Sequence, residues 1–234
     1  MNPRHELRFP LTTACAIALI AACLARSATA GLPVPDAAQS QIGIGMALVG
    51  TTGGVADPVG EKTIVIRDQL GNPIPNSTVA IHFGSCQGPG GIRICDPQPF
   101  PGVSVSCADE AVAALTNVNG IATFRVAGFA TNPGGGTFGA PAPGSSGFCA
   151  TVTADGFLMG TLAVAAYDQN GTGGVDTPDL ALFLNDLFSM FGTTLNRTRS
   201  DYDFNGKVDV RDLGMWLRVR FAGNSSVGCP TACP

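Results

Sequence analysis

Residues 168–179 read D-Q-N-G-T-G-G-V-D-T-P-D, and residues 201–212 read D-Y-D-F-N-G-K-V-D-V-R-D. Both windows place oxygen-bearing side chains at positions 1, 3, 5, 9 and 12, a glycine at position 6 and a valine at position 8. A calcium ion takes about six to eight oxygen ligands, which alternate residues of a tightly turning loop can supply when a glycine permits the bend. The spacing therefore predicts two calcium-binding loops, the second beginning 33 residues after the first.

Each predicted loop is followed by a segment whose apolar residues recur at intervals of three and four, which predicts a helix. The apolar positions are Leu180, Phe183, Leu184 and Leu187 in the first segment, and Leu213, Trp216, Leu217 and Val219 in the second. The first loop is entered from a strand-like run at 162–167, and the second from a polar connector at 193–200. Each loop therefore has only an exiting helix, and because a single half-buried helix is unstable alone, we expect the two helices to pack together.

These features depart from an ordinary EF-hand, which has a helix on both sides of its loop and a glutamate as its last ligand. They resemble the type I dockerin domain, a paired half-EF-hand module, over residues 167–224. The resemblance implies that most of the side-chain ligands bind the ion directly, that Asp176 and Asp209 bind it through a water molecule, and that Asp179 and Asp212 bind it with both carboxylate oxygens. It also implies that the backbone carbonyls of Gly174 and Lys207 complete the two sites. The implied side-chain ligands are Asp168, Asn170, Thr172, Asp176 and Asp179 in the first loop, and Asp201, Asp203, Asn205, Asp209 and Asp212 in the second.

The two predicted sites are unequal. Thr172 offers a hydroxyl where the family has a carboxylate or an amide, and the first loop carries three carboxylates against four in the second. Because affinity follows the ligand charge, we expect the second site to bind calcium more tightly.

Dockerins bind cohesin modules through residues just before the last ligand and further along the helix. The resemblance places this partner surface at Thr177 and Pro178 in the first repeat and at Val210 and Arg211 in the second. The two pairs differ from the family's common Ser-Thr pair and from each other. Arg218 and Arg220 either add charge contacts to the partner or form a solvated helix face.

The N-terminal thirty residues have the organisation of a secretory signal peptide. Basic residues precede an apolar run at 11–24, and Ala28-Thr29-Ala30 gives a small-x-small cleavage site. The alternative is a bacterial lipoprotein site with Cys23 as the lipidated residue. We therefore expect a secreted or lipid-anchored protein, without a transmembrane segment.

Residues 31–166 read as short strands separated by turns, which predicts a β-sandwich. Strand patterns lie at 63–67, 77–83, 121–126, 148–153 and 157–164, with Asn119-Gly120 and Asp155-Gly156 as hairpin turns. The runs D-Q-L-G-N-P-I-P-N-S-T-V-A-I (68–81) and T-N-V-N-G-I-A-T-F-R-V (116–126) resemble bacterial immunoglobulin-like domains of the invasin/intimin type. The expected fold is mainly β: an immunoglobulin-like sandwich followed by a small helical calcium module.

Six cysteines follow the predicted cleavage site, and an even number in an exported chain predicts three disulfides, with zinc ligation as the weaker alternative. We expect a local Cys229–Cys233 bridge within a C-terminal tail at 225–234, and pairs Cys86–Cys95 and Cys107–Cys149.

Composition narrows the function. The formal net charge is −4 and no basic patch is visible, which argues against a nucleic-acid partner. No pair of carboxylates suggests a glycosidase, and His82, on an alternating strand, is a poor catalytic candidate. Residues 31–166 contain no Trp or Tyr, which disfavours a sugar platform. We therefore predict a non-catalytic exported protein that docks a cohesin-type or other cell-surface protein; the alternative is an accessory role in polysaccharide degradation, by carbohydrate binding or association with a glycoside hydrolase.

Overall fold

The computed structural model describes residues 33–86, 91–130, 148–188, 198–221, 225, 227–229 and 231–233. The predicted signal peptide at 1–30 and the alternative lipidation residue Cys23 lie outside these residues. Contacts divide the chain into the units Met1–Pro33 and Val34–Pro234. The predicted β region and the predicted calcium module thus belong to one compact unit.

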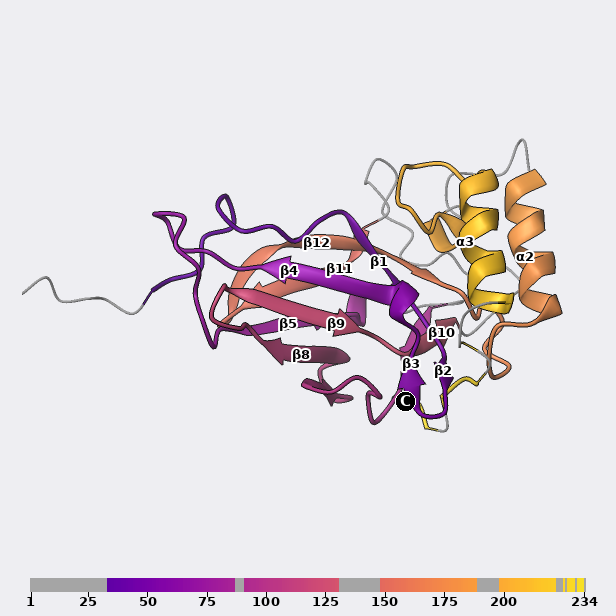
Figure 1. Cartoon of the computed structure of the whole chain (residues 1–234), viewed down its shortest axis with the longest axis horizontal. Coiled ribbons are helices and arrows are strands. Elements are labelled where there is room, and N and C mark those ends of the chain that lie inside the picture. The colour runs from indigo at the N-terminus through magenta and orange to yellow at the C-terminus, as the bar shows by residue number, and fades with distance from the viewer. Residues whose placement is uncertain are drawn as a thin grey trace, which may run out of the picture. The chain divides into compact units, whose positions relative to one another are not determined.

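The protein is mainly β, and its largest sheet has six strands (Figure 1). In spatial order these are β1 (Gly45–Leu48), β12 (Phe157–Ala166), β11 (Phe148–Ala154), β5 (Thr78–His82), β8 (Ala111–Leu115) and β7 (Val103–Ser106). β1 pairs parallel with β12, whereas the other neighbours are antiparallel. The parallel pair joins an early strand to the strand that leads into the first loop.

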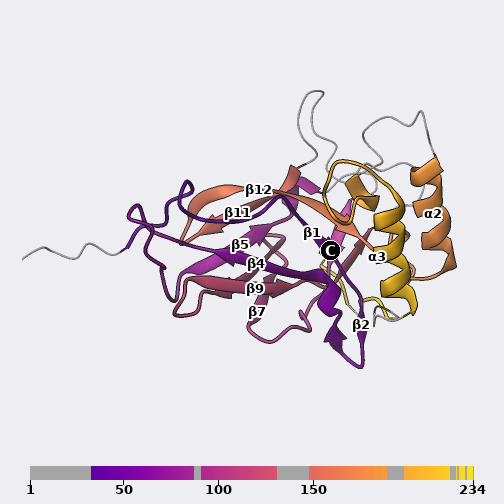
Figure 2. The same ribbon diagram turned by 45° about the horizontal axis from the view of Figure 1, so that its top comes forward.

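Three two-stranded sheets accompany the large one. They pair β4 (Glu61–Val65) with β9 (Ile121–Arg125), β6 (Ile92–Ile94) with β10 (Gly128–Ala130), and β2 (Thr51–Thr52) with β3 (Val55–Ala56). Among the described residues, the helices are α2 (Thr177–Phe188) and α3 (Val210–Phe221), with short 3₁₀ turns η1 (Pro58–Gly60), η2 (Gly84–Cys86) and η4 (Thr198–Ser200). Figure 2 shows α2 and α3 side by side at one end of the strands.

Strand alternation follows the sequence pattern, but one predicted hairpin is wrong. In β5, Val79 and Ile81 are fully buried while their neighbours are not, as a period of two requires. Asp155 and Gly156 both have positive φ (48° and 84°) and join the antiparallel strands β11 and β12, as predicted. Asn119-Gly120 also forms a tight turn, but β8 pairs with β5 and β7 while β9 pairs with β4. The chain therefore changes sheets at this turn, and the buried Ala122 and Phe124 of β9 join the same apolar cluster as the six-stranded sheet.

Alternate residues of β1 serve two separate cores. Met46 and Leu48 join a cluster that contains apolar side chains of the six-stranded sheet and of β4 and β9. Ala47, with Val49 directly after the strand, joins a second cluster that includes residues of β12 and of both helices. Because successive side chains of a strand point to opposite faces, β1 packs against the core of the β region on one face and against the core shared with the helices on the other. The helices therefore share a core with the strands, as well as with each other.

The predicted apolar face of the second helix is correct except at Leu217. Asp212, Trp216 and Val219 are the buried residues of α3, at intervals of four and three. Leu217 is 38% exposed, because it lies one residue past Trp216 and so turns about 100° away from this buried stripe.

The six cysteines among the described residues are all paired, but every predicted pairing is wrong. The disulfides are Cys86–Cys149, Cys95–Cys229 and Cys107–Cys233. The C-terminal tail runs beside β6: Ala232 forms an antiparallel bridge with Cys95, and Cys233 N–H donates to the Ile94 carbonyl at 2.9 Å. Because the tail is extended against this strand, its cysteines meet partners on other segments, and the expected local Cys229–Cys233 bridge does not form.

Candidate metal centre

The first loop is organised around the carboxylate of Asp179, in the first turn of α2. Its Oδ1 accepts the backbone N–H groups of Gln169 (2.8 Å) and Asn170 (3.1 Å), and its Oδ2 accepts that of Asp176 (2.8 Å). These donors occupy loop positions 2, 3 and 9, so position 12 draws the start and the end of the loop together. A carboxylate also suits the first turn of a helix, where free N–H groups carry positive partial charge.

The second loop repeats this pattern around Asp212, in the first turn of α3. Its Oδ1 accepts from Tyr202 N–H (2.7 Å) and Asp203 N–H (3.3 Å), and its Oδ2 accepts from Asp209 N–H (2.9 Å). These are again positions 2, 3 and 9. The duplication seen in the sequence is therefore a duplication of atomic contacts.

The first aspartate of each loop accepts hydrogen bonds from backbone N–H groups in the middle of the loop. Asp168 accepts from Gly171 N–H at 2.7 Å and from Gly174 N–H at 3.0 Å. Asp201 accepts from Asn205 N–H at 3.1 Å and from Gly206 N–H at 2.8 Å. Gly206 has φ of 85°, a conformation that glycine adopts without strain. Both aspartates are buried.

Three carboxylates converge in the second loop. One oxygen from each of Asp201, Asp203 and Asp212 lies within 4.8 Å of the others. Burial, followed by the charge of Asp212, raises the pKa of Asp201 to about 6. Burial is also the main cause that raises the pKa of Asp212. Crowded, desolvated carboxylates resist ionisation unless a cation compensates their charge.

The first loop has the same electrostatic character with fewer carboxylates. Burial raises the pKa of Asp179 to about 7, and the nearby charge of Asp168 adds to the effect. Burial likewise raises the pKa of Asp168, with a contribution from Asp176. Asn170 stands where the second loop has Asp203.

The remaining predicted ligands differ in their hydrogen bonds and in their exposure to solvent. Thr172 donates its hydroxyl and its N–H to Asn170 Oδ1, and Asn205 donates its amide to Asp203 Oδ2 at 2.8 Å. Asp209 Oδ1 accepts from Arg211 N–H at 2.7 Å, and Lys207 is exposed, whereas Gly174 is buried.

One buried carboxylate oxygen without a hydrogen-bond partner indicates whether the oxygen atoms of these loops could hold a metal ion. Within the described part of the chain, Asp176 Oδ1 is buried without a hydrogen-bond partner. It occupies position 9 of the first loop, beside Asp168 and Asp179. The donors in both loops are oxygen atoms, which hard cations prefer. The residues therefore fit a hard divalent cation.

Position 4 of each loop rests on the β region. Gly171 lies so close to the end of β10 that a Cβ would collide with the Ala130 carbonyl, and Ala130 N–H donates to the Asp168 carbonyl at 2.9 Å. Phe204, with φ of 57°, covers Gly45 of β1, where a Cβ would collide with its ring. The strands thus support both loops.

A buried polar network that was not predicted from the sequence joins the two repeats. Gln169 Nε2 donates to Ser200 Oγ and to Tyr202 OH, both at 2.9 Å. Ser200 Oγ donates to Asp186 Oδ2 at 2.6 Å, and Arg199 forms a two-pronged ion pair with Asp186 at 2.7 and 2.9 Å. The ring of Tyr202 stacks on that of Tyr167, with centroids 4.2 Å apart. Asp186 offered one signal in the sequence, because it lies three residues after Phe183 on the apolar face of the helix.

The predicted partner-binding residues are all at the surface. Thr177 and Pro178 are exposed at the start of α2, and Val210 and Arg211 are exposed at the start of α3. Arg218 and Arg220 are exposed on α3, together with Phe221, which is 78% exposed.

Comparisons with protein-family models, with curated proteins and with solved structures found no match. Among the described residues, no helix is both long and apolar enough to cross a membrane.

Proposed function

We propose that this chain is an exported, non-catalytic protein whose two loops bind calcium ions and present α2 and α3 to a protein partner, as dockerins do with cohesins. The repeated contact pattern around Asp179 and Asp212 carries the proposal. Two loops of different sequence hold the same three backbone donors with the same closing carboxylate. Two loops that bind the same ion with the same geometry would need the same backbone arrangement, and these two loops have it.

Calcium suits the donor set better than zinc or copper, which favour sulfur or imidazole ligands. A bound divalent cation would compensate the buried carboxylates, whose raised pKa values reflect the cost of ionising them without one. Asp168, Asp176 and Asp179 would hold the ion in the first loop. Asp201, Asp203 and Asp212 would hold it in the second, where convergence of carboxylates supports tighter binding.

Isothermal titration of the calcium-free chain with calcium chloride tests the metal proposal. We expect two binding events, with Asp179→Asn removing the weaker and Asp212→Asn removing the tighter. Asp155→Asn, at the exposed β11–β12 turn, is the matched control and should retain both. Absence of calcium binding in the unmodified chain would refute the proposal.

Chelation provides a second test with a structural readout. Calcium binding would contribute to the stability of the loops and of the helices that leave them. We expect EDTA to reduce the helical circular dichroism signal of the full chain, while the disulfide-bonded strands keep their β signal. Unchanged helical signal after chelation would argue against structural calcium.

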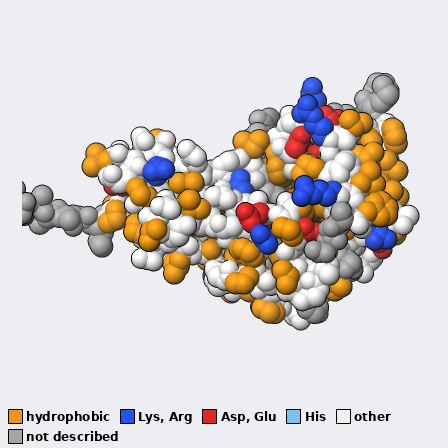
Figure 3. Space-filling view, in the orientation of Figure 1, with side chains coloured by type: hydrophobic (Ala, Val, Ile, Leu, Met, Phe, Trp, Pro, Cys, Tyr) orange, Lys and Arg blue, Asp and Glu red, His pale blue; other side chains and the backbone are white. Residues whose placement is uncertain are grey.

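The outer face of α3 supports a docking role. Val210 and Phe221 are 76% and 78% exposed, and Arg211 and Arg218 lie beside them. Figure 3 shows apolar side chains gathered over the helical end of the unit, with basic side chains next to them. This chemistry fits a partner module with apolar and acidic residues on its surface.

Calcium-dependent capture of immobilised cohesin modules tests the partner. We expect the full chain to bind in calcium and to be released by EDTA, and Arg211→Glu to weaken binding by charge repulsion. Arg93→Glu in β6 serves as a charge-matched control outside α2 and α3. Equal loss in both variants would contradict a docking site on α3.

The β region would act as an immunoglobulin-like spacer rather than as an enzyme. Apolar residues of the six-stranded sheet and of the β4–β9 pair meet in one cluster, which supports a sandwich. The three disulfides are compatible with an extracellular location.

A further inference from the structure

The C-terminal segment returns from α3 to the first loop. We call its described residues, Ser225, 227–229 and 231–233, the strap. Val175 N–H, at position 8 of the first loop, donates to the Ser225 carbonyl at 2.9 Å. Gly228 lies so close to the loop that a Cβ there would be 2.7 Å from Gly173 Cα. The strap thus covers the first loop at the glycine bend and just after it.

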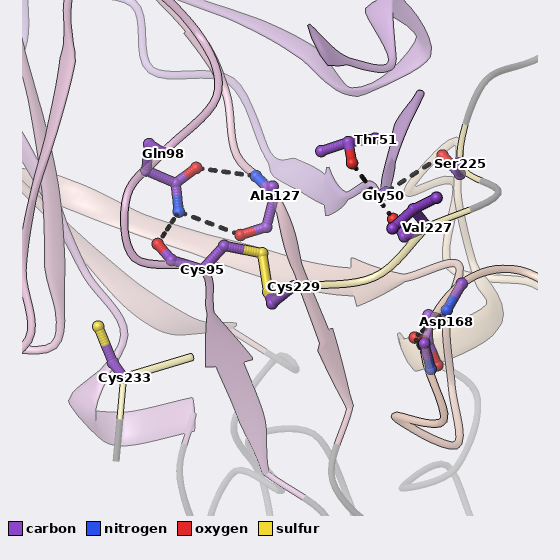
Figure 4. Close-up of a disulfide and its surroundings, with 12 residues drawn as sticks. Gly50, Thr51, Cys95, Gln98, Ala127, Asp168, Ser225, Val227, Cys229 and Cys233 are labelled. Atoms are coloured by element: carbon purple, nitrogen blue, oxygen red, sulfur yellow. Dashed lines mark hydrogen bonds between the residues drawn. A yellow bond between two sulfur atoms is a disulfide. The ribbon is translucent and has the colours of Figure 1, made fainter. Parts of the chain in front are cut away.

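The same segment is hydrogen-bonded to the β region (Figure 4). Ser225 Oγ accepts from Gly50 N–H at 3.1 Å and donates to Asp57 Oδ2 at 3.3 Å. Thr51 and Val227 exchange backbone hydrogen bonds of 2.9 and 3.1 Å. Ser225 therefore contacts the loop with its backbone and the β region with its side chain.

Two disulfides fix the end of the strap. Cys229 is bonded to Cys95, directly after β6, and Cys233 is bonded to Cys107. Gln98 braces this anchor, donating to the Cys95 carbonyl at 2.7 Å and to the Ala127 carbonyl at 3.1 Å (Figure 4). Cross-links that join distant parts of a chain limit its freedom, so the strap is confined to its place over the loop.

We propose that the strap is a disulfide-anchored clamp that holds the first loop in its ligand-ready shape, so that releasing it lowers the calcium affinity of that loop. The inference rests on the proposed function. Loops held in their bound conformation lose less entropy on binding, and the Val175–Ser225 hydrogen bond stabilises such a conformation. The second loop is supported differently, by Phe204 on Gly45, and should be spared.

The test measures calcium affinity of each loop in the full, oxidised chain by isothermal titration. Asp212→Asn isolates the first loop and Asp179→Asn isolates the second. In each background, Cys95→Ser with Cys229→Ser opens the anchor nearest the first loop. Cys86→Ser with Cys149→Ser removes the disulfide that does not involve the strap and is the matched control.

A second variant displaces the strap with all disulfides intact. Gly228→Ala introduces a methyl group against Gly173, and no positive φ restricts substitution at Gly228. Gly214→Ala, where a Cβ would meet nothing within 4 Å, is its matched control. This variant keeps the test valid if the double serine variant does not fold.

We expect both strap variants to weaken calcium binding by the first loop about three- to tenfold, the scale of one lost hydrogen bond, without changing the second. Unchanged affinity of the first loop, or equal weakening of both loops, would overturn the clamp while leaving calcium binding in place. No calcium binding by either loop of the unmodified chain would overturn the proposed function and the clamp together.

Discussion

Asp179 and Asp212 show how much one side chain organises in this protein. Each is buried in the first turn of a helix and gathers three backbone donors from a twelve-residue loop. An asparagine would keep the shape but could accept through only one atom of its amide. The closing carboxylates therefore fix the loop conformation, and in our proposal they also offer oxygen ligands to a cation.

Thr172 makes the first loop the weaker of the two in our proposal. Thr172→Asp adds a carboxylate at position 5, and we expect calcium titration to show tighter binding by the first loop, because affinity rises with ligand charge. Thr63→Asp, on the exposed side of β4, adds the same charge elsewhere and should leave both affinities unchanged. Equal tightening in the two variants would point to net charge as the cause.

The Arg199–Asp186 pair is a buried ion pair between η4 and α2. Both side chains are almost fully buried, at 3% and 1% exposure. Asp186→Ala leaves the guanidinium uncompensated, and we expect a loss of about 3–5 kcal/mol in the free energy of unfolding. Glu61→Ala removes an acid from the exposed Arg125 pair and should cost below about 1 kcal/mol. Urea unfolding of both variants compares them; similar costs would contradict a structural role for the buried pair.

At the scale of elements, each loop contains ionisable groups that folding desolvates. The pKa values of Asp179 and Asp201 lie at about 7 and 6, above the ordinary 3.8 of an aspartate, chiefly because of burial. The folded, calcium-free loops therefore hold protons that the unfolded chain releases.

The sign of the pH dependence follows from this difference. Stability from the protonated carboxylates is complete below pH 3.8 and is lost as the pH rises through about 6 to 7. In EDTA, we expect the urea midpoint to be lower at about pH 8 than at about pH 5. Because asparagine does not titrate, we expect Asp179→Asn to reduce the difference between the urea midpoints at the two pH values. A midpoint that rises across the interval would contradict the prediction.

At the scale of the whole molecule, β1 links the two loops to the β region. Its alternate side chains enter both cores, and Gly45 receives the ring of Phe204. The tail adds covalent links to the β region, through Cys95 and Cys107. The loops are therefore linked to the β region through β1, and the tail that contacts the first loop is linked to it by two disulfides.

The Gly45–Phe204 contact can be measured by a double-mutant cycle. We expect Gly45→Ala to lower the free energy of unfolding by about 1–3 kcal/mol, because the methyl group overlaps the ring. In a Phe204→Ala background the same substitution should cost much less, since the overlapping atoms are gone. Additive effects in urea unfolding would show that the two residues do not contact each other.

The sequence by itself determined what local chemistry controls. The spacing of oxygen-bearing residues and the placement of glycine located both loops, and the periodicity of apolar residues located the two helices and five of the strands, β4, β5, β9, β11 and β12. A tight turn at Asp155-Gly156 followed from residues that tolerate positive φ. These features depend on neighbours within a few positions, so they can be read along the chain.

Only the tertiary structure decided which distant segments meet. The sheet change at Asn119-Gly120, the three disulfide pairings, the buried Asp186–Arg199 pair and the strap over the first loop all depend on packing between residues far apart in sequence. Cys229 and Cys233 illustrate the reason. Their closeness in sequence suggested a local bridge, but an extended tail bound along β6 carries each cysteine to a different partner.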